Sequence, residues 1–271
     1  MPLALVPDAP APSRALGVAP RLWLYTNYDC NLSCSYCVAE STPRAARRGL
    51  PPATAYRLID EAADLGFEEL FLTGGEPFIL PHIFDLIAHA QPLLRVTVLS
   101  NGVALRGARL SRLLALPREG LTIQISLDGA TPDTNDNYRG AGSWHKAIAA
   151  IRALREAGRH VRLGTTLTPE NADALPDLCA LHRSLGIPDE DHVVRPLVRR
   201  GFSVKGIALA LPALVPEITV NRDGVYWHPV STDDDLLVTR DIFPLADAVR
   251  QIATLSAAIQ DVTGGAANQF R

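Results

Sequence analysis

Three cysteines crowd into one short loop near the start of the chain and constrain the fold more than any other feature. Cys30, Cys34 and Cys37 have the spacing C-x3-C-x2-C and directly follow the run 21–26, which predicts a buried strand. Three thiolates on one loop can converge on one metal centre. A structural zinc ion needs four closed ligands, whereas an iron-sulfur cubane held by three cysteines leaves one iron free.

A purely structural role or a disulfide fits these cysteines less well. Structural cysteines scatter along core faces and rarely share one loop. Disulfides fit poorly, because three clustered thiols are an odd set and the chain shows no secretory context. A zinc site completed by Cys179 or a distant histidine remains the alternative. Cys179 stands in an apolar helical stretch with no ligand neighbour in the sequence, so we expect it in the core.

The cysteine loop, with Tyr36 directly before its last cysteine, resembles the signature of the radical S-adenosylmethionine (SAM) superfamily. Further similarities follow in the same order downstream and extend over residues 21–200. The resemblance implies that Cys30, Cys34 and Cys37 hold one [4Fe-4S] cluster and that the fourth iron binds SAM. It also implies that Tyr36 belongs to the cofactor site.

A second motif lies at the end of a short apolar strand, 69–73, which runs straight into Gly74, Gly75, Glu76 and Pro77. Two glycines at a strand end let the backbone approach a ligand closely, and the exposed backbone groups can bind a polar head group. Gly-Gly alone is weak evidence. At this distance after a three-cysteine loop, the four residues resemble the family motif that holds the methionyl amino group of SAM.

Strands and helices alternate along residues 21–200, which implies βαβ units and a parallel sheet. The expected strands cover 21–26, 69–73, 95–99, 121–125, 161–167 and 192–197, and the expected helices cover 51–64, 81–89, 105–116, 144–157 and 172–185. Six units are too few for a closed eight-stranded barrel, and radical SAM enzymes similarly have an open barrel. We predict an α/β fold, a partial (β/α)6 TIM-like barrel with a small C-terminal β-hairpin plus helix extension.

Polar residues stand where the third and fourth strands end. Ser100 and Asn101 close the third strand, and Ser126 and Asp128 close the fourth. Barrel enzymes place function at these strand ends, and such side chains suit a ribose and an amino-acid moiety. Singly, each is explained by a capped turn, because Asn-Gly and Asp-Gly are good turn dipeptides. Together they resemble the ribose- and carboxylate-contacting positions of the family.

Residues 135–140 are expected to continue as a loop. Ser-Leu-Asp-Gly followed by Tyr-Arg-Gly resembles the branch of the family that modifies peptides and related substrates. We expect Arg139 to meet the methionyl carboxylate of SAM through a bidentate fork, which a lysine could not reproduce.

The chain divides into a flexible leader (1–20), the barrel (21–200) and a C-terminal extension (201–271). The prolines of the leader and its lack of a basic start indicate neither a signal peptide nor a membrane span. In the extension, two β-rich runs around an Arg-Asp-Gly turn predict a hairpin, and a helix is expected from about Pro244 to Ile259.

This extension is similar in outline to the cysteine-rich SPASM or twitch domain, but the sequence has no cysteine after Cys179. An auxiliary cluster is therefore not expected. We expect the extension to pack on the open side of the barrel, with Tyr226, Trp227 or His228 at its mouth.

Composition limits the partners. The chain has 271 residues, 47% hydrophobic and 20% charged, which is typical of a globular protein with one large domain. A net charge of -3 gives no global attraction to nucleic acid or to anionic membranes. Four cysteines without an export signal indicate a reducing cytoplasm.

The resemblance implies an enzyme in which one electron cleaves SAM to methionine and a 5'-deoxyadenosyl radical. That radical abstracts hydrogen from a peptide or small-molecule substrate, and the electron comes from a donor such as flavodoxin or ferredoxin. Two alternatives stay open. One is an enzyme of the same superfamily that cleaves a different C–S bond of SAM for group transfer, and the other is a non-enzymatic zinc-binding protein.

Overall fold

The computed structural model describes residues 18–46 and 48–263, so most of the predicted leader lies outside the described residues. The described chain forms one nine-stranded sheet in the order β6-β5-β4-β3-β2-β1-β7-β8-β9. The strands are β1 (Arg21–Asn27), β2 (Glu69–Gly74), β3 (Arg95–Ser100), β4 (Leu121–Ser126), β5 (His160–Leu167), β6 (His192–Pro196), β7 (Ile218–Asn221), β8 (Gly224–Tyr226) and β9 (Leu237–Thr239). The helices are α2 (Pro52–Asp64), α3 (Ile83–Ala90), α4 (Gly107–Ala115), α5 (Pro132–Arg139), α6 (Ser143–Glu156), α7 (Leu175–Ser184) and α8 (Leu245–Thr263), with 3-10 turns η1 (Pro77–Ile79), η2 (Asp189–Asp191), η3 (Leu211–Ala213) and η4 (Asp234–Leu236).

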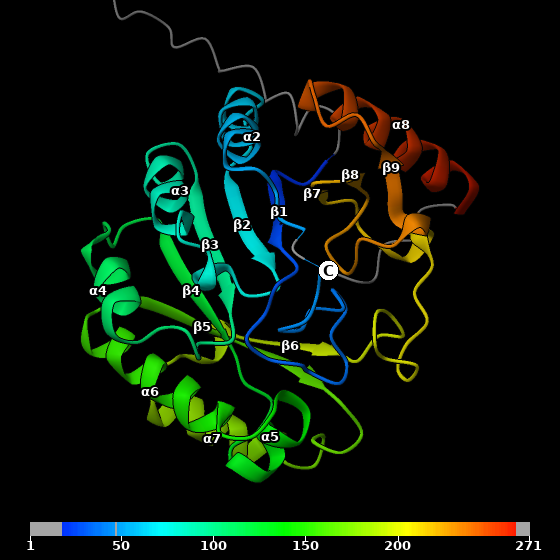
Figure 1. Ribbon diagram of the computed structural model, residues 1–271. Coiled ribbons are helices and arrows are strands. Elements are labelled where there is room, and N and C mark those ends of the chain that lie inside the picture. The colour runs from blue at the N-terminus through cyan, green and yellow to red at the C-terminus, as the bar shows by residue number, and fades with distance from the viewer. Residues whose placement is uncertain (1–17, 47, 264–271) are drawn as a thin grey trace, which may run out of the picture.

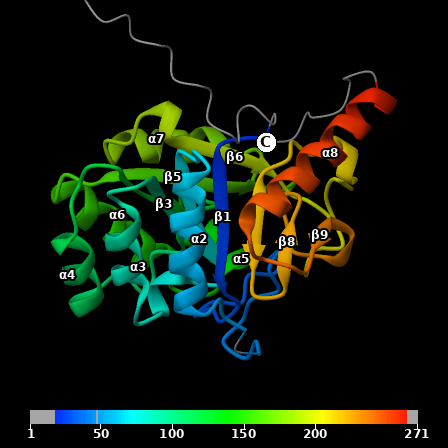
Figure 2. The same ribbon diagram turned by 90° about the horizontal axis from the view of Figure 1, so that it is seen from above.

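The first six strands are parallel, and each pairs with the next along the chain. Helices α2, α3, α4, α6 and α7 lie in an arc on the outer side of the curved sheet (Figure 1). In the view from above, α2 stands beside β1, and α8 runs past β9 (Figure 2). The sheet does not close, because β6 and β9 form its two edges. The predicted open α/β barrel is therefore confirmed.

The two faces of the sheet have different characters, because successive side chains of a strand point to opposite faces. One set is aliphatic, fully or almost fully buried, and belongs to the main core. It comprises Leu22, Leu24, Leu70, Leu72, Val96, Val98, Ile123, Ile125, Val161 and Leu163. The alternate residues of β1, β2, β4 and β5 line a cavity. The sheet thus buries its apolar set against the helices and keeps its polar and aromatic set for the interior of the barrel.

Helix α2 shows how sequence pattern produces this packing. Pro52 occupies its first turn, where a missing N–H costs nothing. Ala55, Leu58, Ile59 and Ala62 follow at helical spacing and are buried. Truncating a core residue such as Leu58 to alanine would cost about 2–5 kcal/mol.

The structure corrects the expectation of a loop at residues 135–140, because Arg139 lies in the last turn of helix α5. Thr131 and Thr134 form a capping box at its start, and Pro132 occupies its first turn. Gly140 ends the helix with a positive φ of 101°. The helix is polar almost throughout, so it carries no apolar period by which the sequence could have predicted it.

Cys179 also differs from its expected place. It lies on α7 but is only partly buried, and its Sγ is 3.8 Å from Nδ1 of His192. The sequence did not place His192 beside Cys179, because His192 belongs to β6, the strand that follows α7.

The predicted C-terminal hairpin is confirmed by the antiparallel pairing of β7 and β8. The structure adds that β7 runs parallel to β1, with Leu22 opposite Ile218 and Leu24 opposite Val220. A third strand, β9, was not predicted because it has three residues. Helix α8 contacts both α2 and β9. The C-terminal residues therefore extend the barrel sheet itself at its β1 side.

No helix within 18–46 and 48–263 has the length and apolar character that a membrane crossing requires.

Candidate functional site

A cavity of about 360 Å³ lies on the inner face of the sheet and reaches the C-terminal strand ends. Most of the side chains that the sequence singled out stand in its wall. They are Cys30, Cys34, Tyr36, Cys37, Gly74, Gly75, Ser100, Asn101, Ser126 and Arg139. Glu76, Pro77 and Asp128 do not line the cavity, and all three are buried.

The cysteine loop connects β1 to α2, and hydrogen-bond donors point at two of its sulfur atoms. The backbone N–H of Leu32 and the side-chain amide of Asn101 donate to Sγ of Cys30, over 3.4 and 3.6 Å. The backbone N–H of Ser41 donates to Sγ of Cys37 over 3.4 Å. Donors of this kind stabilise cluster thiolates and tune their redox potential. The loop therefore fits an iron-sulfur cluster by its donor set.

Burial raises the pKa of Cys30 to about 12 and raises that of Cys34, where the nearby Arg139 opposes the shift. The free thiols are therefore protonated near neutral pH. Metal binding at this loop must displace those protons, which couples loading to pH.

The spacing of the three sulfur atoms bears on the zinc alternative. A single zinc ion draws thiolates to about 3.8 Å of one another, given Zn–S bonds of about 2.3 Å. The Sγ atoms of Cys30, Cys34 and Cys37 do not form a group within 4.8 Å of one another. As they stand, the three thiols are therefore not arranged as the ligands of a single zinc ion.

The two glycines of the second motif are required because neighbouring backbone leaves no room for a side chain. Gly75 donates its N–H to the carbonyl of Asn27, and Glu76 donates to that of Asp29, over 2.8 and 3.0 Å. A Cβ on Gly74 would lie 2.2 Å from the Asn27 oxygen, and one on Gly75 would lie 2.0 Å from the Asp29 oxygen. The close approach therefore joins the motif to the segment that leads into the cysteine loop.

The Glu76 side chain ties two strand ends together. Its carboxylate accepts hydrogen bonds from the Phe78 N–H (3.0 Å), the Ser100 hydroxyl (2.9 Å) and the Asn101 N–H (2.8 Å). Burial raises its pKa to about 7, although these bonds act in the opposite direction. Glu76 thus fixes the end of β3 against the end of β2 and points away from the cavity.

Asp128 and Arg139 form a buried pair. Nε and Nη2 of Arg139 donate to the two carboxylate oxygens of Asp128, over 2.7 and 3.2 Å. Asp128 also accepts from the Thr166 N–H (2.9 Å) and from the Tyr36 hydroxyl. Burial alone would lower the pKa of Arg139, but Asp128 raises it overall. The arginine fork expected to meet SAM is therefore already occupied by Asp128, and Nη1 is the terminal nitrogen outside this pair.

The inner wall of the barrel carries arginines that sequence reasoning missed. Arg21, Arg162 and Arg195 line the cavity. Arg21 pairs with Glu69 and Glu217, and Arg162 has a loose contact with Asp191 at 3.7 Å.

The backbone of Arg195 pairs with β5, but its guanidinium makes no hydrogen bond or ion pair with any described residue. Burial and then Arg162 lower its pKa. Its position within a short strand was the available sequence signal, since a charge there is costly to bury without a partner.

Aromatic rings stand on the same wall. Trp23 and Phe71, on β1 and β2, stack with ring centroids 4.0 Å apart. From the C-terminal region, His228 lines the cavity, as expected for one of the three candidates there, whereas Tyr226 and Trp227 do not. Burial and the charges of Arg195 and Arg200 lower the pKa of His228 to about 3, so the ring is neutral.

Comparison with known proteins shows which family has a sequence like that of this chain. The sequence pattern of the radical SAM superfamily matches residues 24–182. An AdoMet-dependent heme synthase of Methanosarcina barkeri is 34% identical over 176 residues, which cover 64% of this chain and 50% of that protein. The mycofactocin maturase MftC of Mycobacterium ulcerans is 33% identical over 156 residues, covering 57% and 42%. The chain thus spans about half the length of the curated relatives it matches.

Among solved structures, native anSMEcpe with bound AdoMet and a Kp18Cys peptide has a similar fold. The TM-score is 0.68 at 12% identity, and the alignment covers 87% of this chain and 82% of that one. At this identity the likeness concerns the fold alone.

Proposed function

Because the chain belongs to the radical SAM superfamily, whose members are enzymes, we propose that it cleaves SAM reductively at one [4Fe-4S] cluster held by Cys30, Cys34 and Cys37. One observation carries the proposal. The Gly74–Gly75 strand end is hydrogen-bonded to the segment that leads into the cysteine loop, and the loop and the strand end line the same cavity.

The cluster and SAM, when bound, supply one-electron cleavage of a C–S bond and a 5'-deoxyadenosyl radical that abstracts hydrogen from the substrate. The protein orients the cofactor. The strand end at Gly74 and Gly75 offers backbone groups to the methionyl amino group. Asp128 and Tyr36 hold Arg139 so that its Nη1 faces the methionyl carboxylate. The polar side chains for the ribose are Ser100, Asn101 and Ser126.

We further propose that the substrate is a peptide or small molecule with an acidic group. Arginines outnumber carboxylates in the cavity wall, and Arg195 forms no ion pair with a described residue. A substrate carboxylate would supply that partner, since arginine binds carboxylates as a planar fork. The Trp23–Phe71 stack offers an apolar surface beside it. AdoMet and a peptide together occupy the structural neighbour anSMEcpe.

The substrate class can be tested with peptides and small molecules in matched acid and amide forms. Acid forms should stimulate SAM cleavage by the wild-type chain, and Arg195→Gln should raise their KM at least about 10-fold, the loss of one charged hydrogen bond. Arg199→Gln, at an exposed position nearby, is the control. Equal use of acid and amide forms would refute the acidic substrate.

We propose that residues 201–271 act as a cysteine-less, twitch-like extension that closes the β1 side of the barrel (21–200). The β7–β1 pairing and the place of His228 in the cavity wall support this role. Such a cover excludes water from a reactive radical.

The function is tested by anaerobic reconstitution followed by product analysis. Reduced protein with SAM should yield 5'-deoxyadenosine and methionine. Methylthioadenosine would instead indicate cleavage of a different C–S bond and group transfer. Flavodoxin or ferredoxin should replace a chemical reductant if either is the natural donor, and a cytoplasmic location would supply such donors and keep the thiols reduced.

A further inference from the structure

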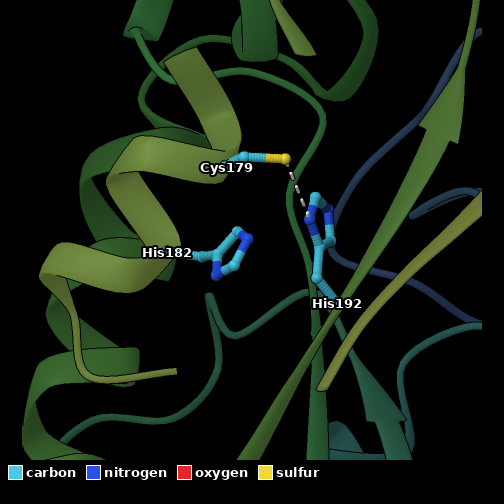
Figure 3. A group of neighbouring side chains, drawn as sticks. All are labelled: Cys179, His182 and His192. Carbon is cyan, nitrogen blue, oxygen red and sulfur yellow. Dashed lines mark hydrogen bonds between the residues drawn. The ribbon is translucent and has the colours of Figure 1, made fainter. Parts of the chain in front are cut away.

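A second group of metal-ligating side chains lies apart from the cysteine loop, between α7 and β6. Cys179 and His182 project from α7, and His192 begins β6; the three side chains point toward one another (Figure 3). Their ligand atoms all lie within 4.8 Å of one another. Within residues 18–46 and 48–263 this is the one such group of three or more. Cys179 and His182 share a helix face because they are three residues apart.

In each histidine, one ring nitrogen is hydrogen-bonded to a protein oxygen. That bond determines which nitrogen keeps a lone pair for a metal ion. Nδ1 of His182 lies 2.9 Å from the carbonyl oxygen of Ile187 and must donate to it, which leaves Nε2 with its lone pair. The Thr165 hydroxyl donates to the carbonyl of Leu127, so it accepts from Nε2 of His192 at 2.8 Å. The lone pair of His192 is then on Nδ1, which faces the Cys179 sulfur.

This pattern is the one that metal-binding histidines have in proteins. Each ring donates one N–H to an oxygen of the protein, which orients it, and keeps the other nitrogen for the metal. The rings also contact each other, with centroids 4.6 Å apart.

The distances suit a single small ion. Tetrahedral zinc, with Zn–S of about 2.3 Å and Zn–N of about 2.0–2.1 Å, sets its sulfur and nitrogen ligands about 3.6 Å apart. The Cys179 sulfur and His192 Nδ1 are already 3.8 Å apart. The remaining pairs need to close by about 1.5 Å at most, which side-chain rotation can provide.

We propose that Cys179, His182 and His192 bind one zinc ion that ties α7 to β6. One thiolate and two imidazoles favour zinc over calcium or magnesium, which require oxygen ligands. Asp189 offers an oxygen 3.6 Å from Nε2 of His182 but is already paired with Arg183. The fourth position is therefore assigned to water.

The site has a structural purpose in this fold. β6 is an edge strand that pairs only with β5 in the sheet. Arg195, Pro196 and Leu197, which follow His192 closely, form part of the cavity wall. An ion that holds the start of β6 to α7 would fix the position of that wall.

Zinc binding is measured on the cluster-loaded, full-length protein with a competing chelator. We expect one zinc per chain, an affinity at least about 100-fold lower for Cys179→Ala, and unchanged iron content. Thr165→Val removes the acceptor for His192, together with the hydrogen bond to the Leu127 carbonyl, and should weaken zinc binding about 10- to 100-fold. His89→Ala, on a distant helix, is the matched control and should bind as the wild type does.

Cobalt gives a second readout that does not depend on the iron-sulfur chemistry. In the triple variant Cys30→Ala, Cys34→Ala, Cys37→Ala, Cys179 is the remaining cysteine. Added cobalt should produce a thiolate-to-metal absorption band that disappears when Cys179 is also replaced. If the triple variant does not fold, the zinc measurement on the cluster-loaded chain decides alone. Absence of stoichiometric zinc there, or equal affinity in Cys179→Ala, would overturn the proposal.

Discussion

The Asp128–Arg139 pair gives a sharp prediction, because both side chains are buried and each depends on the other. The side chain of Asp128 is 0% exposed and that of Arg139 is 9% exposed. Asp128→Asn keeps the shape of the side chain and an oxygen for the Thr166 N–H. It places an amide N–H against the Arg139 Nε–H and removes the counter-charge.

The size of the stability loss follows from the Arg139 charge, which stays buried without its counter-charge. Removing one partner of a buried ion pair costs about 3–5 kcal/mol, mostly because the other charge stays buried. We therefore expect the free energy of unfolding to fall by about 3–5 kcal/mol in Asp128→Asn. If Arg139 also loses its orientation toward SAM, the affinity should fall by about 1.5–3 kcal/mol, the scale of one charged hydrogen bond.

The assay combines urea unfolding of the cluster-free chain with equilibrium SAM binding to the cluster-loaded chain. Asp133→Asn makes the same charge change at an exposed position of α5 and should leave both quantities unchanged. A double-mutant cycle with Arg139→Gln isolates the coupling between the two side chains. Additive losses in that cycle, or a loss below about 0.5 kcal/mol in Asp128→Asn, would refute the reasoning.

Two further predictions concern the site. Gly75→Ala brings a Cβ to 2.0 Å from the Asp29 carbonyl oxygen, so the segment before the cysteine loop must move. Iron content after reconstitution should therefore fall by more than half relative to the wild type, and full iron loading would contradict this. His228 has a pKa of about 3 in the folded chain against an ordinary 6.5, so its neutral form contributes stability above pH 6.5 that is lost as pH falls. Between about pH 7.5 and pH 5 the free energy of unfolding should fall by about 2 kcal/mol for this reason. Urea titrations of His228→Asn should lack this fall. The same pH dependence in both proteins would show that His228 is not the group responsible.

The sequence predicted the barrel well because its strands and helices differ in hydrophobic period and follow one another in order. Strands such as 69–73 are apolar, and α2 has buried residues at helical spacing. It did not predict α5, because that helix is held by a capping box and polar contacts and has no apolar stripe. The three-residue strand β9 is too short to show any period.

At the site, motifs indicated which residues gather but not how they pair. Asp128 and Arg139 were each expected to serve SAM, yet their mutual pairing depends on how α5 stands against β4. The i, i+3 spacing of Cys179 and His182 was visible in the sequence. The approach of His192 was not, because it depends on how β6 returns past α7.

The central claim is tested most directly by iron and acid-labile sulfide in the anaerobically reconstituted full-length chain. We expect about four of each per chain, as in one [4Fe-4S] cluster, and 5'-deoxyadenosine when reductant and SAM are added. The Cys30→Ala, Cys34→Ala, Cys37→Ala variant should hold neither iron nor sulfide, while Cys179→Ala keeps both. Iron and sulfide retained by the triple variant, or a wild-type chain that takes up zinc but no sulfide, would contradict the account.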